Sequence, residues 1–308
     1  MQRHAGFTLL ELLVVMGVVS VLMGLSISYL QRTDPQIVFQ SILAGELRAA
    51  QLTARSEGAP TEVLLLPGRE NEPSTVQARL LQPVVAFHLE PGEPALDEVL
   101  RPVLQGEDVP TGRFGHARRP RDGDRGALVS WPVKPTLLDL RDGFVVRLDL
   151  WLERRSACTI LRLLPAIDLS TDAEGKPRAR MRLHGHSGEG TITATAVSEL
   201  PLPVGRWCTL DVGCDGHGLW ITLDGRELAR GVADGVPEQE PDGVFECSPS
   251  DGAIVGMVDE IRWFVYAFSP PQKLPAELKF EQAYRFAFDQ RGEATELPKV
   301  RFVNLEGT

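Results

Sequence analysis

The sequence predicts an α+β protein, in which a long N-terminal helix packs on a small antiparallel sheet and an all-β sandwich occupies the middle of the chain. Apolar residues fill positions 7–29 and then recur at helical spacing as far as residue 57. From about residue 112 apolar and polar residues alternate, which is typical of strands buried on one face. The 29 glycines and 23 prolines favour many turns and short strands.

The composition limits the class of protein. A length of 308 residues fits one large domain or two ordinary ones. The net charge of −10 argues against a general nucleic-acid-binding surface, so no nucleic acid is expected among the partners. Four cysteines in this length are too few for a disulfide scaffold.

The opening segment is long enough to cross a membrane. Residues 7–29 are 23 positions with a single charge, Glu11. As a helix they reach roughly 34 Å, against a bilayer core of ~30 Å. The rest of the chain has no second apolar run of that length. The sequence therefore predicts one spanning helix followed by a large water-soluble part.

Two ordinary explanations of this segment compete. A secretory signal peptide has an apolar region of ~7–15 residues and a small-residue cleavage site. Here the run is longer, and residues 24–26 (GLS) offer only a weak site. A plain signal anchor would not need Glu11, because a charge inside a span is rare and usually has a partner or a task.

Segment 6–15, GFTLLELLVV, resembles the class III signal of type IV pilins and pseudopilins. The resemblance implies that residues 1–6 are a leader, which a membrane prepilin peptidase removes by cutting between Gly6 and Phe7. It also implies N-methylation of Phe7. Glu11 would then be the fifth residue of the mature chain and would pair with the N-terminal amine of a neighbouring subunit in a filament. Such a partner would make a buried carboxylate tolerable.

The predicted long helix covers residues 7–57, with 7–29 as its transmembrane part. Asp34-Pro35 predicts a kink or break, because proline lacks an N–H and disfavours helix at the preceding residue. Gly58-Ala59-Pro60 predicts the end of the helix. Its expected apolar face consists of Phe39, Leu43, Leu47, Ala50 and Ala54.

Strands are expected over 62–66, 76–81 and 84–89, within a unit assigned to residues 58–105. Together with segment 46–56, they resemble the globular part of H-type pseudopilins and related minor pilins, a helix on antiparallel strands. Residues 92–112, rich in Pro, Gly, Glu and Asp, are expected to form a linker.

The central part of the chain shows the alternation of a sandwich. Positions 144, 146, 148, 150 and 152 are apolar, and segments 208–214 and 219–223 alternate likewise. Asp224-Gly225 is a strong two-residue hairpin signal, and 254–268 is expected to be the long final strand region.

Four pieces of residues 112–270 resemble, in family order, a laminin-G-like, concanavalin A-like jelly roll. The pieces are 112–117, 142–151, 204–212 followed by 218–225, and 256–263. The resemblance implies a jelly-roll sandwich. Its first and last strands are neighbours in such a fold, so a loop of a host domain can accept it.

The C-terminal residues 275–308 are predicted to return to the first unit. Segments 286–294 and 299–305 resemble the last hairpin of H-type pseudopilins, which implies that the sandwich is inserted into a pilin-like domain. The alternative is an appended sandwich followed by a disordered tail. The alternating Val300 and Phe302 and the turn at 289–292 argue against disorder.

An enzyme is not expected. The concanavalin A-like fold hosts endoglucanases, and those resembling the family-16 type need two glutamates and an aspartate on one strand face. The nearest match, 240–246, has the wrong spacing and contains Pro and Gly. Asp259 and Glu260 are adjacent and would face opposite sides of a strand.

No metal or cofactor is predicted, with Ca²⁺ left as an alternative. His184 and His186 could share a strand face, but no further ligand has metal spacing nearby. Asp211, Asp215 and Asp224 flank strand ends and could help to hold Ca²⁺, as in some laminin-G domains, although turn chemistry explains them equally well.

Two further groups are ambiguous in the sequence. A basic cluster lies among acids and is expected to be a solvated turn rather than a DNA-binding patch. In an oxidising compartment a disulfide could form among the cysteines, although Cys208 and Cys214 share a core-facing parity and could instead be buried thiols. The basic cluster consists of Arg113, Arg118, Arg119, Arg121 and Arg125. The two cysteines besides Cys208 and Cys214 are Cys158 and Cys247.

The leading hypothesis is a minor pilin or pseudopilin of a type II secretion or type IV pilus system. It would be a single-pass protein of the inner (cytoplasmic) membrane with its C-terminal part periplasmic or extracellular. Its expected partners are the prepilin peptidase, other pilins or pseudopilins, and a glycan or secreted protein. The alternative is a membrane-anchored lectin delivered by the pilin signal. Its candidate sugar-binding aromatics, for which core packing is the ordinary alternative, are Trp131, Trp151, Trp220 and Trp263.

Overall fold

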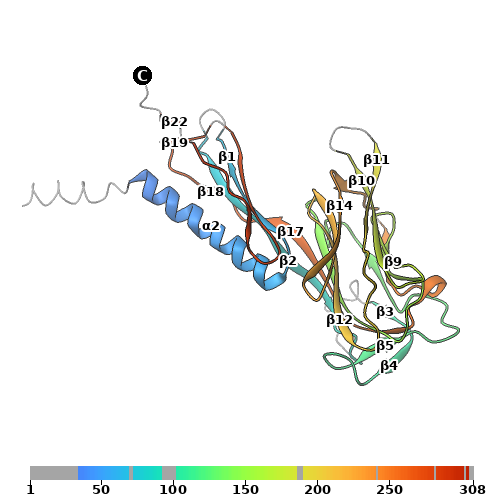
Figure 1. Ribbon diagram of the computed structural model, residues 1–308. Helices are drawn as coiled ribbons and strands as arrows, with labels where there is room; N and C mark the ends of the chain where they lie inside the picture. The colour runs from blue at the N-terminus through green and yellow to red at the C-terminus, as the bar shows by residue number, and fades with distance from the viewer. Residues whose placement is uncertain are drawn as a thin grey trace, which may run out of the picture.

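The computed structural model describes residues 34–68, 72–91, 102–185, 190–240, 242–280, 282–301 and 303–304. The predicted leader and transmembrane segment, with Gly6, Phe7 and Glu11, lie outside the described residues. In the part of the chain that is described, no helix is both long and apolar enough to cross a bilayer. That part is a mostly-β, jelly-roll-like sandwich preceded by one long helix (Figure 1).

Helix α2 (Pro35–Glu57) begins and ends where local chemistry dictates. Asp34 is its N-cap, and the Asp34 carboxylate accepts a hydrogen bond from the N–H of Gln36 at 2.9 Å. Pro35 occupies the first turn, where its missing N–H is not needed. Gly58 closes the helix in the left-handed conformation, with φ 61°. The predicted break at Asp34-Pro35 is thus a helix start, and the predicted stop at Gly58 is confirmed.

The strands form two large antiparallel sheets and one small one. The first sheet contains β1 (Thr61–Leu66), β2 (Thr75–Phe87), β4 (Glu107–Val109), β5 (Ala117–Arg119), β7 (Phe144–Leu152), β12 (Trp207–Cys214), β13 (Gly218–Leu223), β14 (Arg226–Val232), β17 (Gly256–Phe268), β18 (Gln272–Lys273), β20 (Tyr284–Phe288) and β21 (Ala294–Glu296). The second contains β3 (Val103–Leu104), β6 (Val129–Val133), β8 (Cys158–Leu163), β9 (Ile167–Thr171), β10 (Pro177–His184), β11 (Thr191–Val197), β15 (Val236–Pro237) and β16 (Gly243–Cys247). Strand β19 (Leu278–Lys279) pairs with β22 (Val303–Asn304), and a short 3₁₀ helix covers Ser250–Gly252.

The sandwich core forms where the two sheets face each other. Alternate residues of β7 from Phe144 to Leu152 point into it, as do Cys208, Leu210, Val212 and Cys214 of β12. The alternation predicted for 144–152, 208–214 and 219–223 is therefore confirmed. The other face of β7 is also covered, since Val145 belongs to a separate apolar cluster beneath the end of α2.

Two long strands connect the sandwich to the rest of the molecule. β2 and β17 pair antiparallel, with Arg79 opposite Phe268 and Phe87 opposite Ile261. One end of β2 also pairs with β1, and one end of β17 with β7, so both strands run from the α2 side into the sandwich (Figure 1). The first sheet is therefore continuous across the two parts.

The strands expected over 76–81 and 84–89 are one strand, and that prediction was wrong. Pro83, which lies between the two expected strands, is at a β-bulge where the register between β2 and β17 shifts. A bulge tolerates the missing N–H of proline, so the strand continues through it.

The segment expected to be a linker, 92–112, contains short strands. β3 pairs with β6 of the second sheet, and β4 pairs with β5 of the first. β3 is apolar in sequence and β4 begins with two acidic residues, and both are short edge pieces with largely exposed side chains.

The C-terminal residues return to the α2 side. Residues of α2, β1, β2 and β20 share a second apolar cluster, which includes Phe39, Val63 and Phe286. The hairpin expected between 286–294 and 299–305 has a different second strand, because β20 pairs with β21 at 294–296. The tight turn from Asp289 to Gly292 brings the chain back at once, so residues 303–304 pair with β19 instead.

Candidate functional site

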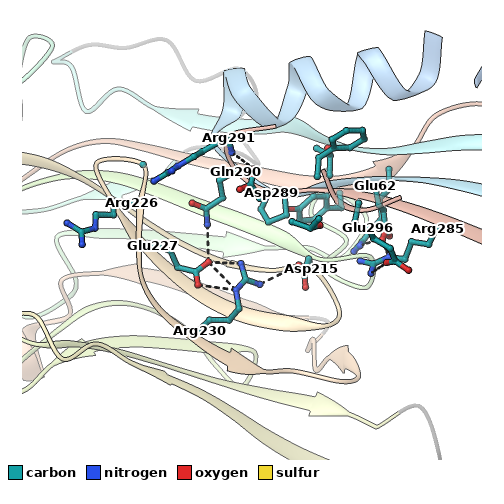
Figure 2. A pocket seen from close by; sticks show the side chains of 18 residues that line it. Glu62, Asp215, Arg226, Glu227, Arg230, Arg285, Asp289, Gln290, Arg291 and Glu296 are labelled. Atoms are coloured by element: carbon teal, nitrogen blue, oxygen red, sulfur yellow. Dashed lines mark hydrogen bonds and ion pairs between the residues drawn. The ribbon is translucent and has the colours of Figure 1, made fainter. Parts of the chain in front are cut away.

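A groove with a volume of about 590 Å³ lies at the junction of the two parts (Figure 2). Its floor comes from β1, β2 and β17. One wall is the sandwich strand β14 with the turn before it, and the other is the hairpin β20–β21. The volume is in the range of small-molecule binding sites, and most side chains that Figure 2 labels are charged.

The floor contains a buried ion pair and a buried phenol. Arg79 pairs with Glu62 at 3.0 Å and also donates to the carbonyl oxygen of Asp142. The Arg79 guanidinium lies over the ring of Tyr266, 4.7 Å from its centroid. Glu62, Arg79 and Tyr266 are each less than a tenth exposed. Neighbouring strands therefore hold all three side chains in fixed positions.

The hydroxyl of Tyr266 is buried and has no hydrogen-bond partner among the described residues. Burial, with a smaller contribution from Asp215, raises the pKa of Tyr266 well above its ordinary value. The group is therefore a neutral hydroxyl that can both donate and accept. An unsatisfied buried hydroxyl is uncommon in folded proteins, which makes this one informative.

The sandwich wall carries a linked set of polar groups. Arg230 of β14 pairs with Glu227 at 2.7 Å and lies 3.8 Å from Asp215. Gln290, from the opposite wall, donates to Glu227 at 3.3 Å. The two walls thus touch each other through this hydrogen bond (Figure 2).

The opposite wall is held by its own turn and by α2. The carboxylate of Asp289 accepts from the N–H groups of Arg291 and Glu293 at 2.9 and 2.8 Å. Gln51 and Arg55 of α2 donate to the carbonyl oxygens of Gly292 and Arg291 at 2.9 and 3.0 Å. The helix therefore fixes the position of the hairpin tip.

On the floor side of the same wall, Arg285 pairs with Glu62 and, at 3.3 Å, with Glu296. Each carboxylate lining the groove thus has a cationic or N–H partner. The side chains of Arg226 and Arg291 are exposed and make no hydrogen bond or ion pair within the described structure. The lining consequently has two guanidinium groups free to bind an anion.

The three aspartates considered for Ca²⁺ do not converge. Asp211 is buried against Arg147 at 2.9 Å, Asp215 caps the turn at 217–218, and Asp224 accepts from the N–H of Thr209. In the described ranges no three His, Cys, Asp or Glu side chains are placed to hold a metal ion. His184 is exposed at the end of β10, and His186 lies outside the described residues.

The four cysteines are free, buried thiols. Burial raises the pKa of Cys208 and of Cys247 to about 12, and that of Cys214 to about 11. Burial also raises the pKa of Cys158. The predicted alternative of buried thiols is the one found.

Three of the four tryptophans considered for sugar stacking are unavailable to a ligand. Trp131, Trp220 and Trp263 have no exposed surface, and Trp151 is half-buried. Trp131 packs edge-on against Phe87 at a centroid distance of 5.3 Å. These rings therefore stabilise the core instead of forming a platform for a sugar.

The remaining candidates have structural partners. In the basic cluster, Arg113 pairs with the buried Asp149 at 2.5 Å and Arg119 with Glu153 at 3.2 Å. In the glycosidase-like stretch, Glu246 pairs with Arg162 at 2.5 Å. Both sets of charges are therefore partly neutralised within the fold.

The groove could not be located from the sequence. Its free arginines follow ordinary turn sequences, 224–225 and 289–290, and its floor residues come from strands far apart in the chain. The Asp-Gly at 224–225 predicted a hairpin, and its positive φ values of 49° and 74° confirm the turn. Nothing local indicates that this turn faces the β20–β21 hairpin.

Comparison with known proteins identifies one family motif. A model described as the prokaryotic N-terminal methylation motif matches residues 1–27. No curated protein matches the chain. The motif is the type IV prepilin signal, and it indicates a non-enzymatic protein that is exported in the manner of pilins and pseudopilins.

Several solved structures share a distant likeness with the chain. Domain 4 of AbnA, a GH43 extracellular arabinanase from Geobacillus stearothermophilus, is 15% identical, with 62% of this chain and 95% of that chain covered and a TM-score of 0.42. Domains LG4–5 of the mouse laminin α1 chain are 19% identical, with 60% and 45% covered and a TM-score of 0.34. A galectin from Caenorhabditis elegans is 17% identical, with 44% and 89% covered and a TM-score of 0.30.

Proposed function

We propose that this chain, which carries the N-terminal methylation motif, is a minor pilin or pseudopilin of a type II secretion or type IV pilus system. The motif at residues 1–27 is the observation that carries the proposal. It implies processing by a prepilin peptidase and assembly with other pilins. Helix α2, which follows the motif and packs on β1, β2 and β20, supports a pilin-like arrangement of helix and sheet.

The proposed roles of the processing residues follow the motif. Cleavage between Gly6 and Phe7 releases a new amino terminus, which is methylated. The carboxylate of Glu11 then pairs with the amine of a neighbouring subunit inside the membrane, where an unpaired charge is costly. The mature protein spans the inner membrane once, with the described residues periplasmic or extracellular.

The mature amino terminus tests this proposal directly. The protein is expressed in a host that contains a prepilin peptidase, purified from the membrane, and examined by intact-mass and N-terminal peptide mass spectrometry. We expect a chain that begins with methylated Phe7. An intact Met1, or cleavage beyond residue 20, would refute the proposal.

The sandwich is proposed to be a displayed surface for contact with a glycan or a secreted protein. Its attachment supports this role, because β2 and β17 continue from the α2 side into the sandwich without a flexible connection. A displayed surface would thus keep a fixed direction relative to the helix.

A membrane-anchored lectin that uses the pilin signal only for delivery is the second candidate, favoured by the open, polar groove. Cross-linking in cells separates the two. A minor pilin is recovered joined to other pilins, whereas a delivered lectin is recovered alone although its amino terminus is processed.

A further inference from the structure

We propose that the outer face of strands β10 and β11 binds a linear acidic polysaccharide. Its acidic groups would bond the arginines of β10, and its hydroxyl groups would bond the threonines of β11 beside them. We call this surface the β10–β11 face. The inference rests on the displayed-surface part of the proposed function and names the site and the class of ligand. It does not depend on cleavage or filament assembly.

The alternation of β10 places its arginines in one exposed row. Alternate residues from Ala179 to Leu183 point into the sandwich core, so the residues between them point outward. The outward residues Arg178, Arg180 and Arg182 are all exposed. Successive arginines are about 6–7 Å apart along the strand, because every second residue lies on the same face. A chain with regularly repeated anionic groups can therefore meet more than one guanidinium at once.

Strand β11 supplies a second row, made of hydroxyl groups. In the antiparallel pairing, Arg180 is opposite Thr195 and Arg182 is opposite Thr193. Opposite residues of paired strands have their side chains on the same face, about 4.5–5.5 Å apart. Both threonines are exposed, whereas Ala194 between them is buried. Each of these two arginines thus has a hydroxyl group beside it.

The charges around the row favour an anion on its β11 side. Arg178 and Arg180 make no hydrogen bond or ion pair with other described residues, and Arg182 pairs with Glu238 at 3.0 Å. On the β9 side, Asp168 is opposite Arg180. Strand β11 contains no acidic residue. The unneutralised guanidinium groups are therefore next to the threonine hydroxyls, and acids lie only on the other side of the row.

The β10–β11 face is directed away from helix α2. The end of α2 contacts the outer face of the first sheet at Arg147, and β10 and β11 belong to the second sheet. Figure 1 accordingly shows these two strands on the far side of the sandwich from α2. A polymer can thus approach the face without meeting the helix.

Other polyanions fit this face less well. Strands β8 to β11 contain no Phe, Tyr or Trp, so single-stranded nucleic acid would lack the rings on which bases stack. Strand β10 is paired on both sides, so its main chain cannot add an acidic peptide as a further strand. A polysaccharide needs neither feature, since it offers acidic groups and hydroxyls at once.

The test is isothermal titration calorimetry of the full-length chain in detergent. The probes are the galacturonic acid hexamer, its dimer, the methyl-esterified hexamer, hexaglutamate and a thymidylate hexamer. We expect binding of the acidic hexamer, and at least about tenfold weaker binding of the ester, which has no charge, and of the dimer, which reaches fewer arginines. Equal binding of the ester or the dimer, equal or tighter binding of hexaglutamate or thymidylate, or no binding of the acidic hexamer would overturn the proposal.

Arginine variants locate the binding. Arg178→Gln and Arg180→Gln should each weaken binding of the acidic hexamer about three- to fivefold, as expected for exposed ion pairs, and the double variant at least about tenfold. Arg48→Gln is the matched control, because it removes the same charge at an exposed position on α2 and should not change the affinity. Full affinity in the double variant, or an equal loss in Arg48→Gln, would overturn the proposal.

A threonine variant tests the hydroxyl row. Thr193→Val combined with Thr195→Val keeps the shape of both side chains and should weaken binding of the acidic hexamer about threefold or more, without lowering the midpoint of thermal unfolding. Unchanged affinity would overturn the role of β11. The mass of the mature amino terminus, measured on the same preparation, shows separately whether the pilin assignment holds.

Discussion

The guanidinium of Arg147, in the middle of β7, donates a hydrogen bond to the main-chain carbonyl oxygen of Glu57, the last residue of α2. The same guanidinium pairs with the buried Asp211 at 2.9 Å and lies over the ring of Phe264, 5.3 Å from its centroid. A sandwich side chain thus satisfies one of the carbonyl groups that a helix C-terminus leaves free. The end of α2 and the outer face of the sandwich are therefore joined at one residue.

Removing this contact should strongly destabilise the protein. Arg147→Ala leaves the Asp211 carboxylate, which is 3% exposed, buried without its cation. We expect a loss of about 3–5 kcal/mol in the free energy of unfolding, measured by urea denaturation. The variant Arg147→Met with Asp211→Leu should recover most of the loss, because it removes both charges. Arg141→Ala, at an exposed pair with Asp139, is the control and should change little. A loss below about 1 kcal/mol in Arg147→Ala would contradict the structural role.

Gly143, beside the groove, should not tolerate a side chain. Its φ is 99°, and a Cβ there would lie 2.3 Å from the carbonyl oxygen of Cys214. We expect Gly143→Ala to lower the free energy of unfolding by at least about 3 kcal/mol, from the strain of positive φ and from the clash. Gly123→Ala is the matched control, since Gly123 has φ 93° and nothing within 4 Å of the added Cβ. It should cost only about 1–2 kcal/mol, and equal losses in both variants would show that the clash is unimportant.

The thiols should make the protein less stable at high pH. The pKa of Cys208 and of Cys247 is raised from 9.0 in a free thiol to about 12 in the fold. Between these values the unfolded chain loses the thiol proton and the folded chain keeps it, so stability is full below pH 9 and falls as the pH rises. Each thiol contributes up to ~1.4 kcal/mol per pH unit in this window.

Urea unfolding at pH 8, 9 and 10, compared between the native chain and Cys247→Ala, isolates this contribution. The native chain should lose more stability over the range than the variant does. Iodoacetamide at pH 8 should label none of the four cysteines in the folded protein and all four in guanidinium chloride. Rapid labelling of Cys247 in the folded protein would show that its thiol is accessible.

Glu11→Val should separate processing from assembly. Cleavage after Gly6 and membrane insertion should be unchanged, because the substitution keeps the segment apolar. Incorporation into filaments, measured by cross-linking to other pilins, should fall sharply, because the partner of the neighbouring amine is lost. Leu12→Val is the matched control. Normal incorporation of the Glu11 variant would show that this carboxylate has another role.

Much of the fold could be predicted because its determinants are local. Asp34-Pro35 and Gly58 bound the helix through capping chemistry that involves only neighbouring residues. The alternation over 144–152 assigned each side chain to a face, since successive residues of a strand point in opposite directions. The domain limits proposed at 105, 112, 270 and 275 stay predictions, because β2 and β17 belong to both parts of the first sheet.

The failures involve contacts between distant segments. Separate strands were expected over 76–81 and 84–89, but pairing with β17 places the intervening Pro83 at a bulge and keeps the strand whole. Residues 299–305 alternate like a strand, but the turn at Asp289 supplies β20 with a nearer partner. In both cases the secondary structure of the segment depends on which strand pairs with it, and a local sequence pattern does not specify that partner.

The sequence by itself determined the export signal at 1–27, the helix over 35–57 and the core-facing residues of the sandwich strands, because each depends on the order of neighbouring residues. The tertiary structure alone decided the groove. Glu62, Arg79 and Tyr266 meet there from three strands, and residues of β14 and of the β20–β21 hairpin line its sides. Only the pairing of β2 with β17 and the docking of the hairpin on α2 bring these groups together, and that docking leaves the hydroxyl of Tyr266 buried without a described partner.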